Sequence, residues 1–312
     1  TCSVNIYSCS AVMKQAYLIS THHPPERIHY IVDKLQDEDN CFFIHFDKKL
    51  TIAPEDPYYH KLLQLDNVTV LQDRINVQWG GFTGVLATLM LLRVAVETDA
   101  EYIHIISGQC LPVKSNAYIN DYMERHRGKE YICSSDMPLK REYGWGYNRV
   151  HIYHLHDYYN PRSSKPADVI IKYLNSLLRK VQRILLPLGI RRKYIPFYPQ
   201  LKRGSAWWSL SADCCRYILD YINKNPDFYN RFKYTQLSDE MFFQTIIHDS
   251  PFRDKVADNN LRFLWFDPNA NTHASHVGMN QLGELMKEDV LFARKFEPGS
   301  DVVAYLEEHI YS

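Results

Sequence analysis

Short apolar runs alternate with helical patterns along the first half of the chain. Five runs rich in β-branched and aromatic residues predict strands, at 16–21, 41–47, 68–71, 102–106 and 130–135. Apolar residues at helical spacing predict helices over 25–35 and 82–96. Continuous apolar strands that alternate with helices are typical of a mainly parallel sheet covered on both faces. We therefore expect an α/β protein whose ligands bind beyond the carboxyl ends of the strands.

The second half of the chain predicts one more strand, at 204–211, and helices over 212–223, 237–249 and 301–309. Ser238 stands before the acidic pair Asp239 and Glu240, a pattern typical of the start of a helix. Neither a linker nor an internal repeat divides the chain. We expect a single domain over 14–312, preceded by a disordered start or a cloning remnant at 1–13.

Composition excludes several classes of protein. The 312 residues include 36 Lys plus Arg and 36 Asp plus Glu, so the net charge is zero, which argues against a polycationic binder. With 46% hydrophobic residues and only 12 Gly and 15 Pro, the chain is neither disordered nor fibrous. Seven Cys without a C-x-x-C pair predict free thiols in a reducing compartment. A signal peptide and an apolar stretch long enough for a transmembrane helix are both missing from these residues.

One basic segment interrupts this neutral balance. Between 168 and 203 there are nine Lys or Arg residues and no acidic residue after Asp168, and the apolar residues follow a helical spacing. This pattern is typical of a basic amphipathic helix on an anionic membrane surface. An ordinary surface helix with a solvated basic face fits the same pattern. Nucleic acid binding is disfavoured because no recognised module surrounds the segment.

Several common catalytic and metal-binding motifs are missing. The chain contains no G-x-G-x-x-G, no P-loop and no G-x-S-x-G elbow. Histidines cluster at 151–156 and 273–276, but without Cys or carboxylates at a ligand spacing, which favours hydrogen-bonded or stacked rings over a metal site. The acidic triplet 37–39 lies before a predicted strand instead of after one, so we interpret it as a solvated helix end. We therefore expect no metal.

Two charged pairs are candidates for chemistry. Asp239 and Glu240 stand beside an apolar run, so a carboxylate there would be held rigidly and could act as a general base toward a hydroxyl. Acidic residues also favour the first turn of a helix for electrostatic reasons alone. Arg294 and Lys295 lie between apolar neighbours in LFARKF, which suits a diphosphate. An exposed surface pair is the alternative.

Taken together, these segments resemble the core-2/I-branching β-1,6-N-acetylglucosaminyltransferase and peptide O-xylosyltransferase family, glycosyltransferase family 14. The resemblance runs from about 16 to 296, and its strength lies in the order and spacing of several motifs. These are AYLISTHH, IHFDKK, RINVQWGG, IISGQCLPVKSN, GSAWWSLS, DEMFFQTIIHDSPF, VADNNLRF and LFARKF. The family implies a GT-A fold, a single Rossmann-like α/β domain that binds a UDP-sugar without a metal ion or another cofactor.

The resemblance also implies a mechanism. Glu240 would deprotonate the acceptor hydroxyl as its oxygen attacks the anomeric carbon from the face opposite UDP, so an α-linked donor would give a β-glycoside. Arg294 and Lys295 would hold the leaving diphosphate, because fixed cations can neutralise the charge that grows as the bond breaks. Further contacts are implied for the donor at His22, Asp47 and Trp79, and for the acceptor at Trp207, Trp208 and Asp239. Strand alternation points the two neighbouring tryptophans to opposite faces, so one is expected to stack on a sugar and the other to join the core.

The chain departs from the family pattern in three ways. Cys110 stands in SGQCLP where the family commonly has Asp, and His273 and His276 stand where animal branching enzymes have an Arg. The membrane anchor, stem and paired cysteines of animal members are not visible in these residues. We therefore expect a compact bacterial-type member of surface polysaccharide synthesis at the cytoplasmic face of the membrane, or a Golgi protein if an anchor was removed. Its expected partners are a UDP-sugar, a glycan or lipid-linked glycan acceptor and an anionic membrane.

The sequence thus predicts a metal-independent inverting glycosyltransferase that uses UDP-GlcNAc, with UDP-xylose as the next choice. One alternative is a catalytically idle protein on the same fold that binds a UDP-sugar or a glycan, which Cys110 makes conceivable. A glycoside hydrolase is disfavoured, because it needs two carboxylates across the scissile bond and the sequence offers only one well-placed candidate.

Overall fold

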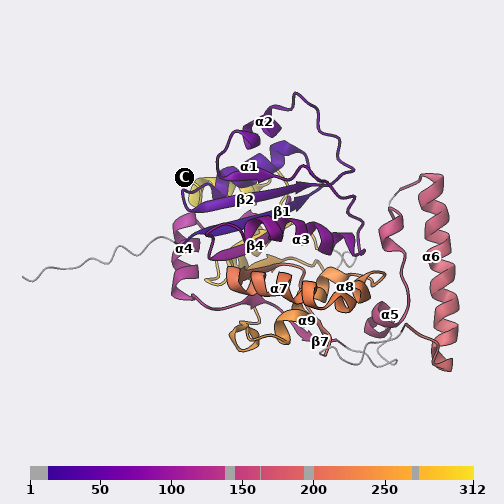
Figure 1. The fold of residues 1–312 in the computed structure, drawn as a ribbon. Helices are drawn as coiled ribbons and strands as arrows, with labels where there is room; N and C mark the ends of the chain where they lie inside the picture. The colour runs from indigo at the N-terminus through magenta and orange to yellow at the C-terminus, as the bar shows by residue number, and fades with distance from the viewer. Residues whose placement is uncertain (1–12, 138–144, 162, 193–199, 269–273) are drawn as a thin grey trace, which may run out of the picture.

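The computed structural model describes residues 13–137, 145–161, 163–192, 200–268 and 274–312. Its centre is a six-stranded sheet in the order β3-β2-β1-β4-β9-β6 (Figure 1). These strands are β1 (Gln15–Thr21), β2 (Asn40–Phe46), β3 (Val68–Val70), β4 (Tyr102–Ser107), β6 (Tyr131–Ile132) and β9 (Trp208–Ser211). The first four strands are parallel, whereas β9 runs antiparallel to both of its neighbours. The predicted α/β class with a mainly parallel sheet is confirmed.

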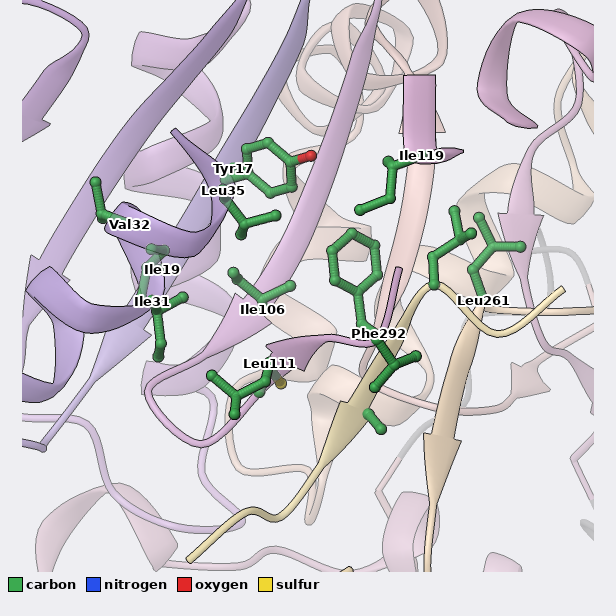
Figure 2. Packing of buried hydrophobic residues seen from close by; sticks show 14 of the residues in the cluster. Tyr17, Ile19, Ile31, Val32, Leu35, Ile106, Leu111, Ile119, Leu261 and Phe292 are labelled. Atoms are coloured by element: carbon green, nitrogen blue, oxygen red, sulfur yellow. The ribbon is translucent and has the colours of Figure 1, made fainter. Parts of the chain in front are cut away.

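Strand β1 shows why the sheet needs helices on both faces. Tyr17 and Ile19 belong to one buried hydrophobic cluster, and Ala16 and Leu18 belong to another. Successive side chains of a strand point to opposite faces, so a continuous apolar run fills two core layers. Figure 2 shows the first layer, in which Tyr17 lies near Phe292.

The helices divide between these two layers. The layer of Tyr17 is covered mainly by α1 (Pro25–Leu35), α4 (Asn116–Arg125) and α11 (Asp301–His309), and it also receives Leu62 and Leu285 from two short helices. The layer of Leu18 is covered by α3 (Thr83–Ala95), α7 (Ala212–Lys224), α8 (Pro226–Phe232) and α9 (Phe242–His248). The other α-helices are α2 (Pro57–Leu63), α5 (Trp145–His151), α6 (Pro166–Leu185) and α10 (Leu282–Leu285).

Shorter strands extend the carboxyl edge of the central sheet. Strand β11 (Phe292–Arg294) lies between β10 (Arg262–Leu264) and β5 (Leu111–Pro112), which follows β4 closely. The Phe296 amide donates to the Gln109 carbonyl at 3.4 Å, so the chain after β11 is held against the loop after β4. A separate ribbon pairs β7 (Ser135–Asp136) with β8 (Lys202–Arg203).

Two predicted strands are shorter than the apolar pattern indicates. The strand predicted at 130–135 is regular only over β6, and the strand predicted at 204–211 begins at Trp208. The residues before Trp208 do not join the sheet, because the Gly204 amide donates to the Glu240 carbonyl at 2.8 Å. A Cβ at Gly204 would also lie 1.8 Å from the Cys133 carbonyl oxygen, so only glycine fits this crossing.

The predicted start of the helix over 237–249 is wrong. Ser238–Glu240 forms a 3₁₀ turn, η4, and the α-helix begins at Phe242. Ser238 is not a helix cap, since its hydroxyl donates to the Gly81 carbonyl at 3.3 Å. A tertiary contact therefore replaces the expected local cap. The remaining 3₁₀ turns are η2 (His156–Tyr158), η3 (Leu186–Leu188), η5 (Arg253–Lys255) and η6 (Met279–Gln281).

Some predictions concern residues outside the described ranges. They include residues 1–12 of the predicted start, Lys193 of the basic segment, and His273. Met13, the last residue of that start, is 2% exposed and belongs to the core. The single domain over 14–312 stays a prediction. Among the described helices none is long and apolar enough to cross a membrane.

Candidate functional site

The carboxyl ends of β1 and β2 form one side of the candidate site. The Asp47 amide, just after β2, donates to the Thr21 carbonyl at 2.7 Å. The Asp47 carboxylate is buried and lies 3.3 Å from the Lys49 ammonium group, whereas His22 is exposed. A Cβ at Gly108, after β4, would lie 2.3 Å from the Thr21 hydroxyl oxygen. The loops after β1, β2 and β4 therefore meet at one edge, as a parallel sheet requires.

The loop 77–81 leads from this edge toward the acidic pair. At its start, the Lys49 ammonium group contacts the Val77 carbonyl and lies 3.5 Å from the Gln78 amide oxygen. At its end, the Leu237 amide donates to the Gly80 carbonyl at 2.8 Å, directly before η4. Between these anchors the Trp79 side chain is 51% exposed. The loop thus carries an exposed indole between the Asp47 and Glu240 sides of the site.

Asp157 holds this loop in place. Its carboxylate accepts the Phe82 amide at 3.0 Å and the Thr83 amide at 2.9 Å, so a residue far along the chain caps α3. A Cβ at Gly81 would lie 2.0 Å from the same carboxylate, which makes glycine necessary. Sequence patterns could not identify this cap, because its carboxylate and its amides are more than seventy residues apart.

Glu240 is the more accessible member of the acidic pair. Its side chain is 34% exposed and accepts the Arg149 guanidinium at 2.8 Å, whereas the Arg149 side chain is only 8% exposed. The ion pair connects α5 to η4 and fixes the direction of the Glu240 carboxylate. Arg149 lies in a Tyr- and His-rich stretch without a recognisable motif, so no sequence pattern predicted its contact with Glu240.

Asp239 has a different environment. Its Oδ1 atom is buried and has no hydrogen-bond partner. Burial first, and then the charge of Glu240, raise the pKa of Asp239 to about 7. Neighbouring carboxylates in such different environments are typical of sites that divide roles between two acids.

The substitution Asp239→Asn is expected to make stability less dependent on pH. In the unfolded chain this carboxyl ionises near pH 4, about three units below its pKa of about 7 in the folded protein. Between these values the folded state keeps a proton that the unfolded state has lost, so the free energy of unfolding falls by about 1.4 kcal/mol per pH unit. The variant lacks this fall, and its advantage in melting temperature should grow up to about pH 7. Thermal melts of both proteins across this range test it; a difference independent of pH would refute the burial argument.

The two tryptophans at β9 separate as strand alternation predicts. Trp208 is fully buried and packs against Phe243 at 5.5 Å between ring centroids. Its predicted contact with the acceptor is therefore wrong, because the indole belongs to the core. Trp207 is half-buried, and the Arg294 guanidinium lies over its ring at 4.5 Å. This stack joins the edge of β9 to the end of β11.

The second predicted cation, Lys295, directly follows β11. Its carbonyl accepts the Val277 amide at 2.8 Å and its amide donates to the Ser275 carbonyl at 3.4 Å, so the segment 275–277 holds the backbone of Lys295. The positive charge of Arg294 also acts on His23. The pKa of His23 is lowered to about 4, first by burial and then by the charges of His22, Arg27 and Arg294. The Nε2 atom of His23 is buried without a hydrogen-bond partner. His23 is therefore a further candidate for contact with the donor. The sequence interpretation had named only its neighbour His22.

A cavity of about 730 Å³ lies between α1 and α11 and reaches His23 and Gln109. Its lining includes neither Glu240 nor Trp207. Cys110 borders this cavity, is 1% exposed, and accepts the Ser107 amide through Sγ at 3.3 Å. The Cys110 side chain therefore closes the turn after β4.

The histidine clusters do not form a metal site within the described ranges. No group of three His, Cys, Asp or Glu side chains there could hold a metal ion. His154 and His156 stack at 5.5 Å, and His154 Nε2 lies 2.9 Å from the Asn148 carbonyl. Burial lowers the pKa of His154 to about 3. The interpretation as stacked, hydrogen-bonded rings is confirmed for these two residues.

Comparison with known proteins gives a consistent family. The model of the family described as "Branch: Core-2/I-Branching enzyme" matches residues 15–289. Xylosyltransferase 1 of Rattus norvegicus is 26% identical over 260 residues, which cover 79% of this chain and 27% of that protein. Xylosyltransferase 2 of the same organism is 22% identical over 333 residues, which cover 96% and 34%. The chain thus spans about a quarter to a third of the length of these relatives.

Among solved structures, mouse xyloside xylosyltransferase 1 in its apo form matches 76% of this chain and 82% of its own. The sequence identity is 11% and the TM-score is 0.31, which is too low to support a structural argument.

Proposed function

The chain belongs to the Core-2/I-branching enzyme family, and from that premise we propose that it is a glycosyltransferase that moves a sugar from a UDP-sugar to a hydroxyl group of a glycan acceptor. The observation that carries the proposal is the Glu240 carboxylate, partly exposed and held by Arg149. It lies on the loop system that also presents Trp79 and Asp47. The xylosyltransferase relatives support the same class of reaction.

In the proposed reaction Glu240 is the general base. Its carboxylate takes the proton of the acceptor hydroxyl as that oxygen forms a bond to the anomeric carbon. The bond from this carbon to the diphosphate breaks in the same step, and UDP leaves with the electron pair. Attack from the face opposite UDP inverts the configuration, so an α-linked donor gives a β-glycoside.

Arg294 and Lys295 would neutralise the leaving diphosphate. Stacking on Trp207 restrains the Arg294 guanidinium, and a restrained cation stabilises developing charge without reorganising. On this basis we propose a GT-A enzyme that needs no divalent metal. His22, Asp47 and Trp79 would contact the donor, and Trp207 and Asp239 would border the acceptor.

The identity of the donor sugar is a finer part of the proposal. The sequence motifs favour GlcNAc and then xylose, whereas the names of the relatives favour xylose. The proposed acceptor is a surface glycan or its lipid-linked precursor in a bacterial cell, with the enzyme at the cytoplasmic face of the membrane.

A panel of UDP-sugars tests the proposal, with thermal stabilisation and UDP release measured for each. We expect UDP-xylose or UDP-GlcNAc to stabilise the protein, and UDP to be released with a glycan acceptor at the same rate in EDTA as in Mg²⁺ or Mn²⁺. Stabilisation without release or product would indicate the idle binding protein instead. A strict requirement for metal would contradict the proposed role of Arg294 and Lys295.

A further inference from the structure

Helix α6 presents an apolar face to solvent. Seven large hydrophobic side chains at helical spacing are between 45% and 73% exposed along α6 and the following turn: Ile170, Tyr173, Leu174, Leu177, Val181, Ile184 and Leu188. At about 100° per residue they occupy one side of the helix. Exposed apolar patches that continue over several turns mark sites of interaction, whereas isolated exposed residues do not.

The opposite side of α6 attaches it to the rest of the protein. Asn175, the only buried residue that the helix contains, accepts the Leu155 amide at 3.0 Å through its side chain. Gln182 exchanges two side-chain hydrogen bonds with the backbone of Tyr153, at 2.7 and 3.0 Å. Figure 1 shows α6 beside the main body, along its outer edge. The polar contacts thus face inward and the large apolar side chains face outward, the reverse of an ordinary surface helix.

Cations line the polar side of α6. Lys172, Lys180 and Arg183 are exposed. At about 100° per residue, Lys180 lies roughly 80° from the centre of the apolar face, and Lys172 and Arg183 lie roughly 140–160° from it. Arg191 is also exposed, just beyond η3. Arg192 differs from the rest of the basic segment, because it is 6% exposed and donates to the Arg231 and Lys233 carbonyls at 2.7 Å.

Two kinds of partner could cover the apolar face of α6, a second copy of the chain or a membrane, and the charges on the helix favour the membrane. A second copy of the chain, packed face to face through α6, would offer these cations no acidic partner, because the helix has no acidic residue after Asp168. An anionic bilayer accepts the apolar side chains below its headgroups and the cations among them. With its cations and a length of 20 residues, α6 suits the interface plane better than the bilayer interior. We propose that α6 is a membrane-surface helix that binds anionic phospholipid.

The contacts of α6 link this surface to the candidate site. The segment that α6 holds, between Tyr153 and Tyr159, includes Asp157, the cap of α3 beside Gly81. The same region follows Arg149, the partner of Glu240. If the proposed function holds, a docked helix would bring the acceptor side near the bilayer, which favours an acceptor anchored in lipid. Lipid binding itself does not depend on that function.

Vesicle co-sedimentation tests the proposal without any enzymatic assay. The purified protein is expected to bind vesicles of equal parts phosphatidylcholine and phosphatidylglycerol, and pure phosphatidylcholine at least tenfold more weakly. Raising the salt from about 0.1 M to 1 M should weaken binding strongly, since the screening length falls from about 10 Å to about 3 Å. The triple variant Lys172→Glu, Lys180→Glu and Arg183→Glu should lower the partition coefficient for anionic vesicles by about 100-fold or more. Each cation near the surface contributes about fivefold, and three such factors multiply to about 100.

Matched controls separate the surface from a general effect of charge. Lys129→Glu, Lys224→Glu and Lys287→Glu change the net charge equally on other elements and should retain at least half of the binding. Leu177→Glu with Ile184→Glu should abolish binding, whereas Leu63→Glu with Phe266→Glu, also exposed apolar residues, should not. Equal melting temperatures confirm that each variant is folded.

Two results would overturn the proposal. One is binding that is unchanged in both α6 variants. The other is a wild-type dimer, seen by analytical ultracentrifugation, that Leu177→Glu with Ile184→Glu dissociates while vesicles bind neither protein. With a soluble acceptor, the rate of UDP release from the donor should be equal in the wild type and in all of these variants. If none of these proteins released UDP, the proposed function would be contradicted, whereas the result on lipid binding would still stand.

Discussion

Replacement of Glu240 by Gln is expected to slow sugar transfer by about 10²- to 10⁴-fold, the usual contribution of a general base. Glutamine keeps an oxygen that can accept the Arg149 guanidinium, so the contact at 2.8 Å need not be lost. It cannot take the acceptor proton. The turnover number should therefore fall, while the dissociation constant for UDP, measured by calorimetry, changes less than about twofold.

The control for this variant is Glu124→Gln, which also removes one carboxylate from an ion pair but lies on α4, in the exposed pair with Arg127. It should keep full activity. Glu240→Ala is less informative, because it leaves the nearly buried Arg149 without its partner. A Glu240→Gln enzyme with more than a tenth of the wild-type rate would remove Glu240 from the role of base.

The second large effect is expected at Arg294. Arg294→Ala removes both the cation and the stack on Trp207, and should lower kcat/KM for the UDP-sugar by about 10²- to 10³-fold. Arg294→Lys keeps the charge but loses the planar group, so its activity should lie between those of the wild type and the Ala variant. Steady-state kinetics and UDP titrations on the three proteins measure this order.

Arg216→Ala serves as the matched control, since Arg216 is exposed on α7 and pairs only locally with Asp213 at 2.9 Å. If Arg294→Ala retained kcat/KM within threefold and bound UDP normally, the diphosphate would be held elsewhere. Tighter binding of metal by the Arg294→Ala variant is not expected, because the described residues offer no cluster that could hold an ion.

Much of the fold could be predicted from local patterns. The apolar run that became β1 and the helical spacing that became α1 match the structure within a residue, because both elements bury a face whose period the sequence records. Prediction failed where a tertiary contact determines the backbone. The acidic pair lies in η4 instead of a helix because Leu237 and Ser238 bond to the loop 77–81.

The candidate site shows the same division at the level of side chains. Sequence motifs pointed to Glu240 and Arg294, but the partners that orient them, Arg149 and Trp207, become apparent only in three dimensions. For the adjacent tryptophans, alternation predicted two environments. Only the packing of Trp208 against Phe243 decided which indole is core.

By itself, the sequence determined the α/β class, the family and the pattern of apolar faces, since each depends on periodicity or on motifs read in order. It also showed that α6 would be amphipathic and basic. Only the tertiary structure decided which face of α6 points inward, because a few polar contacts at Asn175 and Gln182 outweigh the local pattern. Likewise, the sequence placed Asp239 and Glu240 side by side, and only folding buried one carboxylate and paired the other.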